Sequence, residues 1–329
     1  MKKIIAIIGT GNASETHING YNEIENIDIK WIFSKKIDRA YDLSKKYDIP
    51  NYTQNYEDIL NDSEVEIIDI VNINYQHLDF AERALKRGKN IIIEKPIDID
   101  IKKAKRFYEK YKNSDRSILV VYQYPYSETF KKLGEIIYSK QYGNLKAYKI
   151  KYFSFRDDDY YSKKWTSDTT KAGGGVLINQ GIHFINLIYG LMGYSDMNIF
   201  ASRQNITHKI EVEDTIFMQT IHKNGVIGSF SFSSGLPSEM CIELLFKDTI
   251  VWTKGNQVVV EGIKKKTIPT PKKGSFKDMI NEYLIHLKKN PGYKMNFKEA
   301  VMDLDIVLSS YLSAKKKEII KFKILKVGS

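Results

Sequence analysis

The first 120 residues alternate between short apolar runs and longer segments with a helical pattern. Residues 3–8 (Lys-Ile-Ile-Ala-Ile-Ile) are almost continuously apolar and rich in isoleucine, which predicts a parallel strand buried on both faces. Strands that alternate with helices of about ten residues indicate βαβ units and a doubly wound α/β domain with a parallel sheet. Further strands are predicted at 27–33, 67–73, 90–93 and 117–122, and helices at 38–47, 78–87 and 101–111.

The hydrophobic period changes after residue 122. Several segments alternate apolar and polar residues with a period of two, which is typical of an antiparallel sheet with one covered face. We therefore predict two domains, 1–122 with a doubly wound parallel sheet and 123–329 with an α+β fold and an open, mostly antiparallel sheet. The alternating segments are 146–155, 215–222, 226–233, 242–246 and 258–261, and helical patterns end at Ser139 and span 175–191, 276–287 and 297–314.

Composition limits the class of protein. The length of 329 residues suits two domains better than one, and a single cysteine excludes an internal disulfide framework, so we expect a cytoplasmic protein. The apolar run Ile4–Ile8 is too short for a signal peptide, and we expect no membrane-spanning helix. The net charge of +11 indicates a nucleic acid, a membrane surface or a phosphorylated small molecule as partner.

A glycine-rich turn follows the first strand. Gly9-Thr10-Gly11-Asn12-Ala13-Ser14 has the spacing of the dinucleotide fingerprint G-x-G-x-x-G, with serine at the third glycine. Gly9 permits the tight turn, and Gly11 lets backbone amides approach a pyrophosphate at the helix N-terminus. We therefore predict that Gly9, Gly11, Asn12 and Ala13 bind NAD or NADP in a Rossmann domain.

The end of the second strand bears on the choice between the two cofactors. An acidic residue there binds the ribose hydroxyls of NAD, whereas basic residues accommodate the 2′-phosphate of NADP. The strand ends Phe33-Ser34-Lys35-Lys36, with no carboxylate and two lysines. This charge pattern favours NADP or tolerance of both cofactors, although Lys35 and Lys36 are equally compatible with ordinary surface charges.

Two further motifs carry candidate chemistry. Glu94-Lys95-Pro96 ends the fourth strand, where ligands bind in open α/β sheets, and burial there would lower the pKa of the Lys95 ammonium. In the second domain, residues 173–175 are three glycines that would permit close approach to a ligand or to the nicotinamide. Asn179 and His183 follow on one helical face, and histidine is the usual proton-transfer residue near neutral pH.

The order and spacing of these motifs, with His17, Asn74 and His77 between them, resemble the Gfo/Idh/MocA family of nicotinamide-dependent sugar oxidoreductases. The resemblance covers essentially the whole chain. It implies that the second domain binds substrate and forms a homodimer or homotetramer through its open sheet. It also implies a role in cofactor binding for a further set of residues at the strand ends, Asn72, Asn74, His77, Glu94 and Lys95.

The chain departs from the family pattern in an informative way. The aspartate that the family usually carries four residues before the catalytic histidine is Asn179 here, and the usual aspartate three residues after it is Asn186. Asparagine cannot accept a proton, so the resemblance implies a Lys95-Asn179-His183 arrangement. Asn179 would orient the sugar, while His183 and Lys95 perform acid–base chemistry.

An asparagine in this position is similar to one subgroup, the UDP-N-acetylglucosaminuronate 3-dehydrogenases of surface-polysaccharide synthesis. That subgroup carries a similar Arg and Tyr-x-Lys-x-Trp segment before its glycines. It usually has an acid where Ser34 stands here, so this resemblance favours NAD whereas the lysines favour NADP. The resemblance implies that a uronate carboxylate or diphosphate binds Arg156 and Lys163, since arginine forms bidentate pairs with such groups. Matching residues of this segment are Arg156, Tyr160, Tyr161, Lys163, Trp165 and Asp168.

These observations predict an NAD(P)-dependent dehydrogenase that oxidises a sugar secondary alcohol, at C3 of a UDP-N-acetylhexosaminuronate or a related nucleotide sugar. His183 would be the general base, and Lys95 would stabilise the developing alkoxide. Two alternatives remain open: another sugar or inositol dehydrogenase or keto-sugar reductase, and a non-catalytic NADP-sensing regulator. Because the lysines are dispersed and no recognition helix is evident, we expect no nucleic acid, no membrane and no metal as partner.

Overall fold

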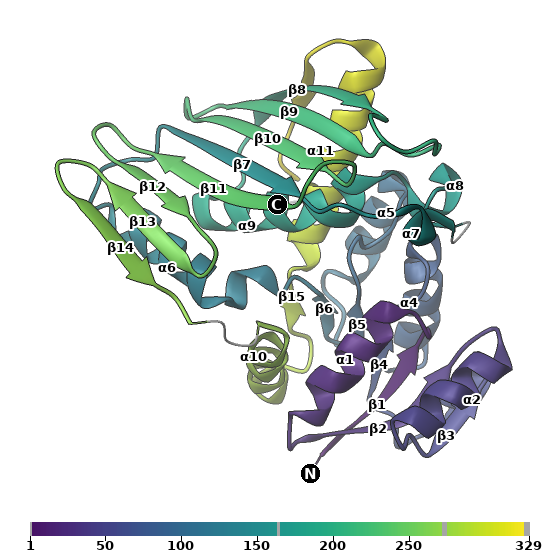
Figure 1. Cartoon of the computed structure of the whole chain (residues 1–329). Coiled ribbons are helices and arrows are strands. Elements are labelled where there is room, and N and C mark those ends of the chain that lie inside the picture. The colour runs from purple at the N-terminus through teal and green to yellow at the C-terminus, as the bar shows by residue number, and fades with distance from the viewer. Residues whose placement is uncertain (1, 163–164, 272–274, 326–329) are drawn as a thin grey trace. The chain divides into compact units, whose positions relative to one another are not determined.

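The computed structural model describes residues 2–162, 165–271 and 275–325. The chain forms two compact units (Figure 1), and the fold class predicted from the sequence is confirmed. Unit 1 consists of residues 1–123 and 274–301, and unit 2 of residues 124–273 and 302–329. Each unit has its own sheet and its own hydrophobic core.

Unit 1 is built on a seven-stranded sheet in the order β15-β6-β5-β4-β1-β2-β3, in which every pair is parallel. Figure 1 shows helices on both sides of this sheet, which explains why its central strands are apolar on both faces. Ile5, Ile7 and Ile8 of β1 are fully buried. The strands are β1 (Lys3–Ile8), β2 (Ile27–Phe33), β3 (Asn51–Thr53), β4 (Ile67–Ile70), β5 (Asn90–Ile93), β6 (Ile118–Val120) and β15 (Lys294–Met295).

The helices of unit 1 connect these strands. Capping side chains begin two of them: Asn55 accepts from the Glu57 amide, and Asp100 accepts from the amides of Lys102 and Lys103. The helical elements are α1 (Asn12–Asn22), α2 (Ile37–Lys46), α3 (Tyr56–Asn61), the 3₁₀ turn η1 (Asn74–Gln76), α4 (His77–Lys86), α5 (Ile101–Tyr111) and α10 (Ser275–Lys289).

Unit 1 takes one segment from far along the chain. Residues 275–301 pack with the first 123, whereas the division predicted from the sequence at residue 122 assigned them to the second domain. The reason is tertiary: β15 hydrogen-bonds to β6 as a seventh parallel strand, and the ring of Phe297 packs 5.8 Å from that of Phe107. Neither contact leaves a signal in the local hydrophobic pattern.

Unit 2 contains a nine-stranded sheet in the order β14-β13-β12-β11-β7-β10-β9-β8-β16. All neighbouring pairs are antiparallel except β10 and β7, which are parallel. The strands are β7 (Ala147–Phe153), β8 (Met197–Gln204), β9 (Thr215–His222), β10 (Ile227–Ser233), β11 (Glu239–Leu245), β12 (Ile250–Thr253), β13 (Gln257–Glu261), β14 (Lys265–Pro269) and β16 (Ile320–Phe322).

Helices cover one face of this sheet and leave the other open (Figure 1). Along β9, Ile216, Met218 and Thr220 are buried, whereas Phe217 and Ile221 are about half exposed, at 49% and 51%. The helical elements are η2 (Tyr124–Tyr126), α6 (Glu128–Ser139), α7 (Asp158–Ser162), α8 (Thr169–Ala172), the π-helix η3 (Leu177–Gly181) and α9 (Ile182–Met192), together with α11 (Phe297–Lys316), which begins in unit 1.

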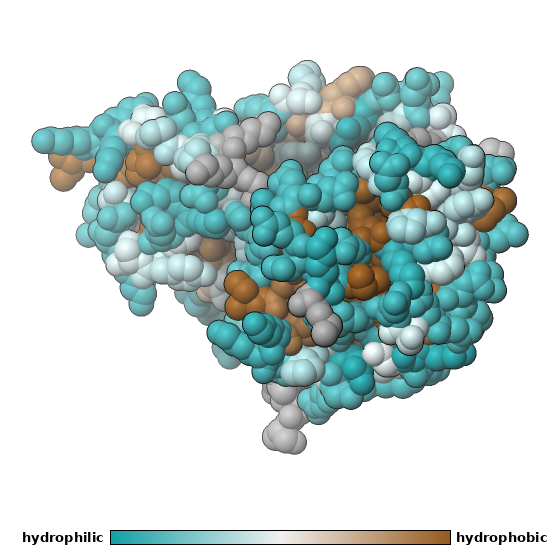
Figure 2. Space-filling model, turned by 90° about the horizontal axis from the view of Figure 1, so that it is seen from below, coloured by the Kyte–Doolittle hydropathy of each residue, from teal (hydrophilic) through white to brown (hydrophobic). Residues whose placement is uncertain are grey.

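Within the described residues, one helical stretch is long and apolar enough by composition to cross a membrane. It runs from Thr169 to Met192, and 72% of its most apolar window is buried inside the structure. Its apolar character is therefore that of a core helix. On the face drawn in Figure 2, hydrophilic residues predominate and hydrophobic residues form separate small patches.

Candidate functional site

The glycine turn after β1 adopts a conformation that only glycine accommodates well. Gly9 has a φ of +131°, and a Cβ there would lie 2.6 Å from the carbonyl oxygen of Val71 at the end of β4. Gly11 is the N-cap of α1 and supplies no capping side chain. A Cβ on Gly11 would meet no atom within 4 Å, so open space lies at this helix N-terminus.

The end of β2 lies beside this turn. The Gly9 amide donates to the Phe33 carbonyl at 3.0 Å, and the Ser34 hydroxyl lies 3.3 Å from the Thr10 hydroxyl. Ser34 is buried, with 9% of its surface exposed, whereas Lys35 and Lys36 are exposed. The structure therefore brings the predicted fingerprint and the predicted cofactor-selecting residues of β2 together.

The loop after β4 contains three of the predicted cofactor residues. His77 is fully buried, and its ring nitrogens lie 2.8 Å from the Pro96 carbonyl and 3.1 Å from the Asn72 carbonyl. Burial lowers the pKa of His77. His77 thus holds the ends of β4 and β5 together, with Asn74 beginning η1 between them. The buried Oδ1 atom of Asn72 has no hydrogen-bond partner within the described residues.

Glu94 and Lys95 lie at the end of β5, and the Lys95–Pro96 bond is cis. The Lys95 amide donates to Glu94 Oε2 at 2.9 Å, and Glu94 Oε1 lies 3.0 Å from His17 Nε2. Burial lowers the pKa of the Lys95 ammonium, and the Glu94 carboxylate partly opposes this. A lysine with a lowered pKa at a strand end suits proton transfer or oxyanion stabilisation.

These observations fit a bound dinucleotide. An uncapped helix N-terminus with open space at Gly11 provides amides and a positive dipole end for a pyrophosphate. The Val71 carbonyl packs on Gly9. In the next residue, the Oδ1 atom of Asn72 lacks a hydrogen-bond partner within the described residues and can accept one from a ligand. Gly9, Gly11, Asn12, Ala13 and Ser34 would hold such a group.

Two of the three glycines of unit 2 pack closely on other parts of the same unit. Gly173 and Gly174 have φ values of +83° and +154°. A Cβ on Gly174 would lie 2.2 Å from the Tyr311 hydroxyl, and one on Gly175 would lie 1.8 Å from the Glu213 carbonyl oxygen. The close approach that these glycines permit is therefore to Tyr311 and Glu213 of the same unit.

Glu213 organises the backbone that follows. Its carboxylate accepts from the amides of Gly175 at 2.8 Å and Leu177 at 3.1 Å and from the Tyr311 hydroxyl at 2.7 Å, and it is 3% exposed. The segment 177–181 is a π-helix, which connects into α9. Asn179 lies in this π-helix and His183 in the first turn of α9. A π-turn of this kind is frequent at functional sites.

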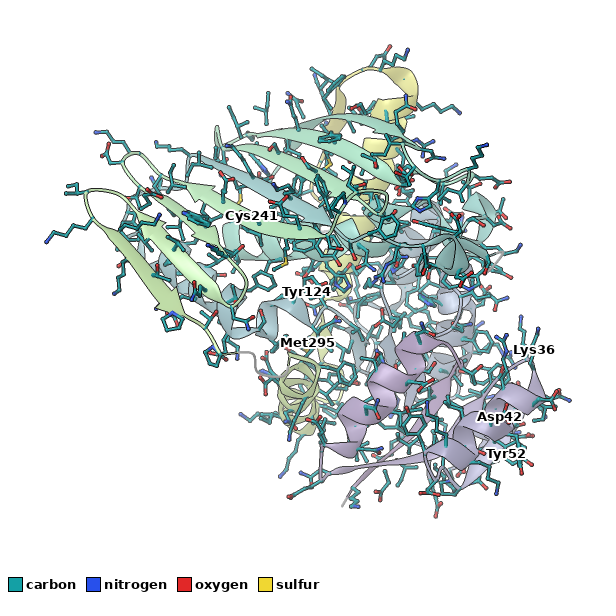
Figure 3. The ribbon with its side chains drawn as sticks, in the orientation of Figure 1. Lys36, Asp42, Tyr52, Tyr124, Cys241 and Met295 are labelled. Atoms are coloured by element: carbon teal, nitrogen blue, oxygen red, sulfur yellow. The ribbon has the colours of Figure 1, made fainter. Side chains whose placement is uncertain are left out.

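His183 is 4% exposed and stacks on Tyr124, with ring centroids 4.4 Å apart and planes inclined by 13°. Burial, together with the neighbouring Tyr152, raises the pKa of the Tyr124 hydroxyl, whereas Arg156 lowers it. Tyr124, labelled in Figure 3, is therefore a neutral partner that fixes the plane of the His183 ring. The sequence analysis did not identify Tyr124, which has no motif around it.

Arg156, Tyr161 and Asn179 come together around one small hollow. Asn179 Nδ2 donates to the Tyr160 hydroxyl at 2.7 Å, and the Arg156 guanidinium lies over the Tyr160 ring, 5.1 Å from its centroid. Tyr161 hydrogen-bonds Ser234 at 2.6 Å. The hollow is lined by Arg156, Tyr160, Tyr161 and Asn179 among others. Trp165 is half-buried nearby in sequence, and Lys163 lies outside the described residues.

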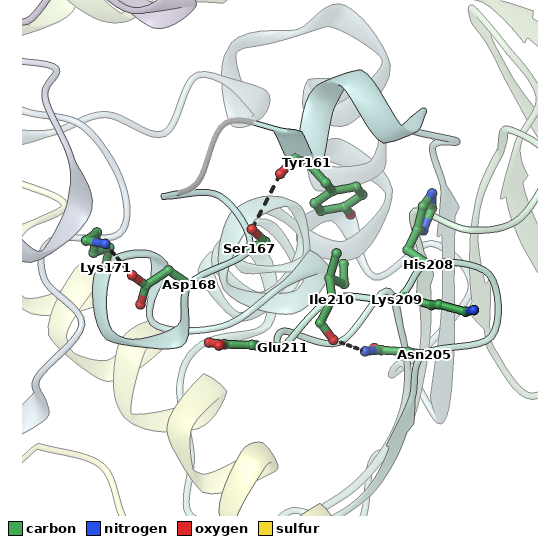
Figure 4. A pocket seen from close by; sticks show the side chains of 9 residues that line it. All are labelled: Tyr161, Ser167, Asp168, Lys171, Asn205, His208, Lys209, Ile210 and Glu211. Atoms are coloured by element: carbon green, nitrogen blue, oxygen red, sulfur yellow. Dashed lines mark hydrogen bonds and ion pairs between the residues drawn. The ribbon is translucent and has the colours of Figure 1, made fainter.

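A larger cavity of about 790 Å³ shares Tyr161 with this hollow (Figure 4). His208 packs against Tyr161, with ring centroids 4.8 Å apart, and its Nε2 atom donates to the Arg156 carbonyl at 2.8 Å. Charges of both signs surround the opening. The lining residues are Tyr161, Ser167, Asp168, Lys171, Asn205, His208, Lys209, Ile210 and Glu211.

Sequence reasoning missed several residues that shape these sites. Asp69 is a fully buried carboxylate within β4, and its signal was a single acid in the run Ile67-Ile68-Asp69-Ile70. Glu213 and Tyr311 support the glycine segment but lie far from it in sequence. Asn186, in the place of a family aspartate, donates to the buried Asp303 at 2.9 Å and is therefore part of the core.

Comparison with known proteins gives two family matches. Residues 3–122 match the model of the oxidoreductase family with an NAD-binding Rossmann fold, GFO_IDH_MocA, and residues 130–255 match the GFO/IDH/MocA C-terminal domain. Together the matched ranges take in well over half of the chain.

Individual relatives are distant. The Saccharomyces cerevisiae protein YMR315W is 26% identical over 92% of this chain and 88% of its own length. The trans-1,2-dihydrobenzene-1,2-diol dehydrogenase of Mus musculus is 24% identical over 76% of this chain and 74% of the mouse protein. Levoglucosan dehydrogenase in complex with NADH and levoglucosan superposes with a TM-score of 0.88 at 17% identity, over 98% of this chain and 99% of that structure. A likeness at this identity shows a shared fold.

Proposed function

The chain belongs to the Gfo/Idh/MocA family of NAD(P)-dependent oxidoreductases, and from this premise we propose that it oxidises a secondary alcohol of an anionic nucleotide sugar. The proposed reacting carbon is C3 of a UDP-N-acetylhexosaminuronate or a close relative. A bound nicotinamide supplies the hydride chemistry, and the protein supplies binding, orientation and proton transfer.

We assign the proton chemistry to two residues. His183 removes the proton of the reacting hydroxyl as general base, in the ring plane that its stacking on Tyr124 fixes. Lys95 hydrogen-bonds the same oxygen and stabilises the negative charge that develops on it. Asn179 cannot exchange a proton and therefore orients the sugar through hydrogen bonds.

The proposal of an anionic substrate depends on one observation, the cluster of Arg156, Tyr160 and Asn179. The Tyr160 ring holds the guanidinium, while the Tyr160 hydroxyl holds the amide of the proposed catalytic asparagine. An arginine fixed in this way beside Asn179 can bind a carboxylate or phosphate with two parallel hydrogen bonds. The adjoining cavity of about 790 Å³ is of a size suited to the remainder of a nucleotide sugar.

The cofactor preference follows from the end of β2. Ser34 provides no carboxylate to repel a 2′-phosphate, and Lys35 and Lys36 are exposed beside it. We propose that NADP binds at least as well as NAD, because the local charge is positive and the acid that would select NAD is absent at this position.

The open face of the nine-stranded sheet supports self-association. Phe200, Phe217, Ile221, Ile227 and Ile250 are each more than 40% exposed on its strands. Apolar residues exposed on one open sheet face are compatible with a protein interface. We propose a homodimer or homotetramer that covers this face, which sedimentation of the purified protein would test.

The activity can be tested directly with purified protein. A panel of UDP-sugars with and without a uronate carboxylate, together with free sugars and polyols, would be incubated with NAD and with NADP. Turnover would be followed at the nicotinamide absorbance band. We expect reduction with the UDP-hexosaminuronates, and a loss of affinity for them in Arg156→Gln. An equal loss for UDP-sugars that lack the uronate carboxylate would show that Arg156 binds the diphosphate, and no loss there would show that it binds the carboxylate.

Other outcomes would redirect the assignment. Turnover of free sugars alone would make the protein a free-sugar dehydrogenase like its structural neighbour that binds levoglucosan. Tight cofactor binding with no turnover of any sugar would indicate a regulator. The variants Lys95→Ala and His183→Ala should each lose at least about 10²-fold in kcat, and near-normal turnover in both would refute the assignment of these two residues.

A further inference from the structure

A line of three charged side chains runs from the interior of unit 1 to Glu94, whose carboxylate accepts from the backbone amide of Lys95 at 2.9 Å. In order, the three are Asp69 in β4, His17 in α1 and Glu94 at the end of β5. His17 Nδ1 lies 2.7 Å from Asp69 Oδ2, and its Nε2 lies 3.0 Å from Glu94 Oε1. Only Lys95 and Glu94 belong to the motif that the sequence analysis identified.

The geometry determines the protonation state of His17. Ionised carboxylate oxygens can only accept hydrogen bonds, and a neutral imidazole has a single N–H to donate. Two ionised carboxylates on the two ring nitrogens are therefore both satisfied only by the imidazolium. Burial opposes this charge, but Asp69 and then Glu94 outweigh it and raise the pKa of His17 to about 10.

The surroundings exclude water from the inner part of the line, His17 and Asp69, whereas Glu94 and Lys95 are partly exposed. His17 and Asp69 are 1% and 0% exposed. Phe276 covers the His17 ring with centroids 4.5 Å apart, and the absence of a side chain at Gly20 gives it room, since a Cβ there would lie 2.3 Å from the Phe276 ring. Two other titratable groups face the line. Tyr21 donates to Asp69 Oδ2 at 2.8 Å, and the Glu94 charge raises the pKa of His77 against the larger lowering effect of burial.

We propose that His17, held as an imidazolium by Asp69, is a positioning residue for Glu94. It orients the Glu94 carboxylate, and its positive charge limits how far that carboxylate stabilises the protonated form of Lys95. With Lys95 included, the four charges alternate in sign and sum to zero. Asp69 has no acceptor role beyond its Oδ2 contacts with His17 and Tyr21, because its buried Oδ1 has no hydrogen-bond partner within the described residues. The side-chain hydrogen bonds of Asp69 within the described residues are therefore confined to His17, whose positive charge it stabilises, and Tyr21.

The consequence for Lys95 has a definite sign. Loss of the positive charge next to Glu94 leaves the Lys95 ammonium facing a less compensated carboxylate, so more alkaline conditions are needed to deprotonate it. Asp69 could take up a proton in the same variant, which would remove a negative charge. The positive charge lost from His17 is nearer to Glu94 than that negative charge, so its effect on Glu94 is the larger. The direction of the shift therefore does not depend on the response of Asp69, but it requires Glu94 to stay ionised, because it is the Glu94 charge that raises the pKa of Lys95.

The relevance to catalysis rests on the proposed role of Lys95, but the test does not need turnover. In His17→Gln, the rate at which an amine-reactive reagent labels Lys95 would be measured against pH by mass spectrometry on the full-length protein. We expect the midpoint to move to higher pH, so that labelling at a fixed pH below it falls roughly tenfold. Where the enzyme turns over, the alkaline limb of kcat should move in the same direction.

The matched control is Tyr21→Phe, which removes a hydrogen bond to the same Asp69 oxygen without a change of charge. It should leave the labelling midpoint in place, and a shift equal to that of His17→Gln would overturn the proposal. An unchanged midpoint in His17→Gln would also overturn it.

Wild-type protein provides a second test in case His17→Gln does not fold. The ¹⁵N chemical shifts of the His17 ring at about pH 8 should show both nitrogens protonated, although free histidine is neutral there. A neutral ring would refute the proposal. The protein could show a His17 imidazolium and a shifted Lys95 labelling midpoint but no activity on nucleotide sugars. That result would refute the proposed substrate and still support the proposed role of His17.

Discussion

The most demanding structural prediction concerns Glu213, because one buried carboxylate supports the whole segment that carries Asn179. The change is Glu213→Gln, which preserves the shape of the side chain and replaces one acceptor oxygen by an NH₂ donor. In either orientation of the amide, this NH₂ group faces a buried backbone N–H, of Gly175 or of Leu177.

The magnitude follows from these contacts. One buried N–H left without an acceptor costs about 1–3 kcal/mol, and the remaining hydrogen bonds lose the contribution of a charged acceptor, so we expect unit 2 to lose about 2–4 kcal/mol of unfolding free energy. The backbone cannot easily move away, since Gly175 is packed directly on the Glu213 backbone.

The measurement is urea unfolding followed by tryptophan fluorescence, with Glu261→Gln as the matched control. Glu261 undergoes the same chemical change in unit 2, but its ion pair with Lys265 at 3.6 Å is exposed, and a change below about 0.5 kcal/mol is expected there. Equal stability of Glu213→Gln and wild type would refute the conclusion that Glu213 holds the glycine segment.

Three further outcomes are expected. Gly9→Ala places a Cβ 2.6 Å from a backbone carbonyl at a φ of +131°, and should weaken NADPH binding in a fluorescence titration by about tenfold or more, whereas Gly143→Ala, with a φ of +80° and no atom near its Cβ, should leave it unchanged. Replacing both Lys35 and Lys36 by Glu should raise the Kd of NADPH roughly tenfold relative to that of NADH, and an unchanged ratio would contradict the proposed preference. His17 has a folded-state pKa raised from 6.5 to about 10, so its contribution to stability is fully present below pH 6.5 and is lost as the pH rises towards 10; the difference in unfolding free energy between wild type and His17→Gln should shrink over this window, and a constant difference would count against a charged His17.

The two sites differ in how much local sequence says about them. The dinucleotide turn is local: Gly9, Gly11 and Ser34 lie at strand ends whose positions the apolar runs already predict. The support behind Lys95 is not local, because Asp69 and His17 come from separate elements 52 residues apart in the chain. A buried acid in an apolar strand indicates that a partner exists, but only the packed sheet identifies it.

The pattern of apolar residues by itself determined the parallel sheet, its central strands and the change to an antiparallel sheet after residue 122, because burial on two faces or on one leaves a periodic signal within each strand. Short edge strands such as β3 and β16 carry too little of this signal and were not predicted. Three features could be known only from the tertiary structure. Residues 275–301 return to unit 1, the glycines at 173–175 pack on Glu213 and Tyr311, and a π-helix rather than a regular helix carries Asn179. Each depends on contacts between segments far apart in the chain, and the free energy of such contacts is absent from any local pattern.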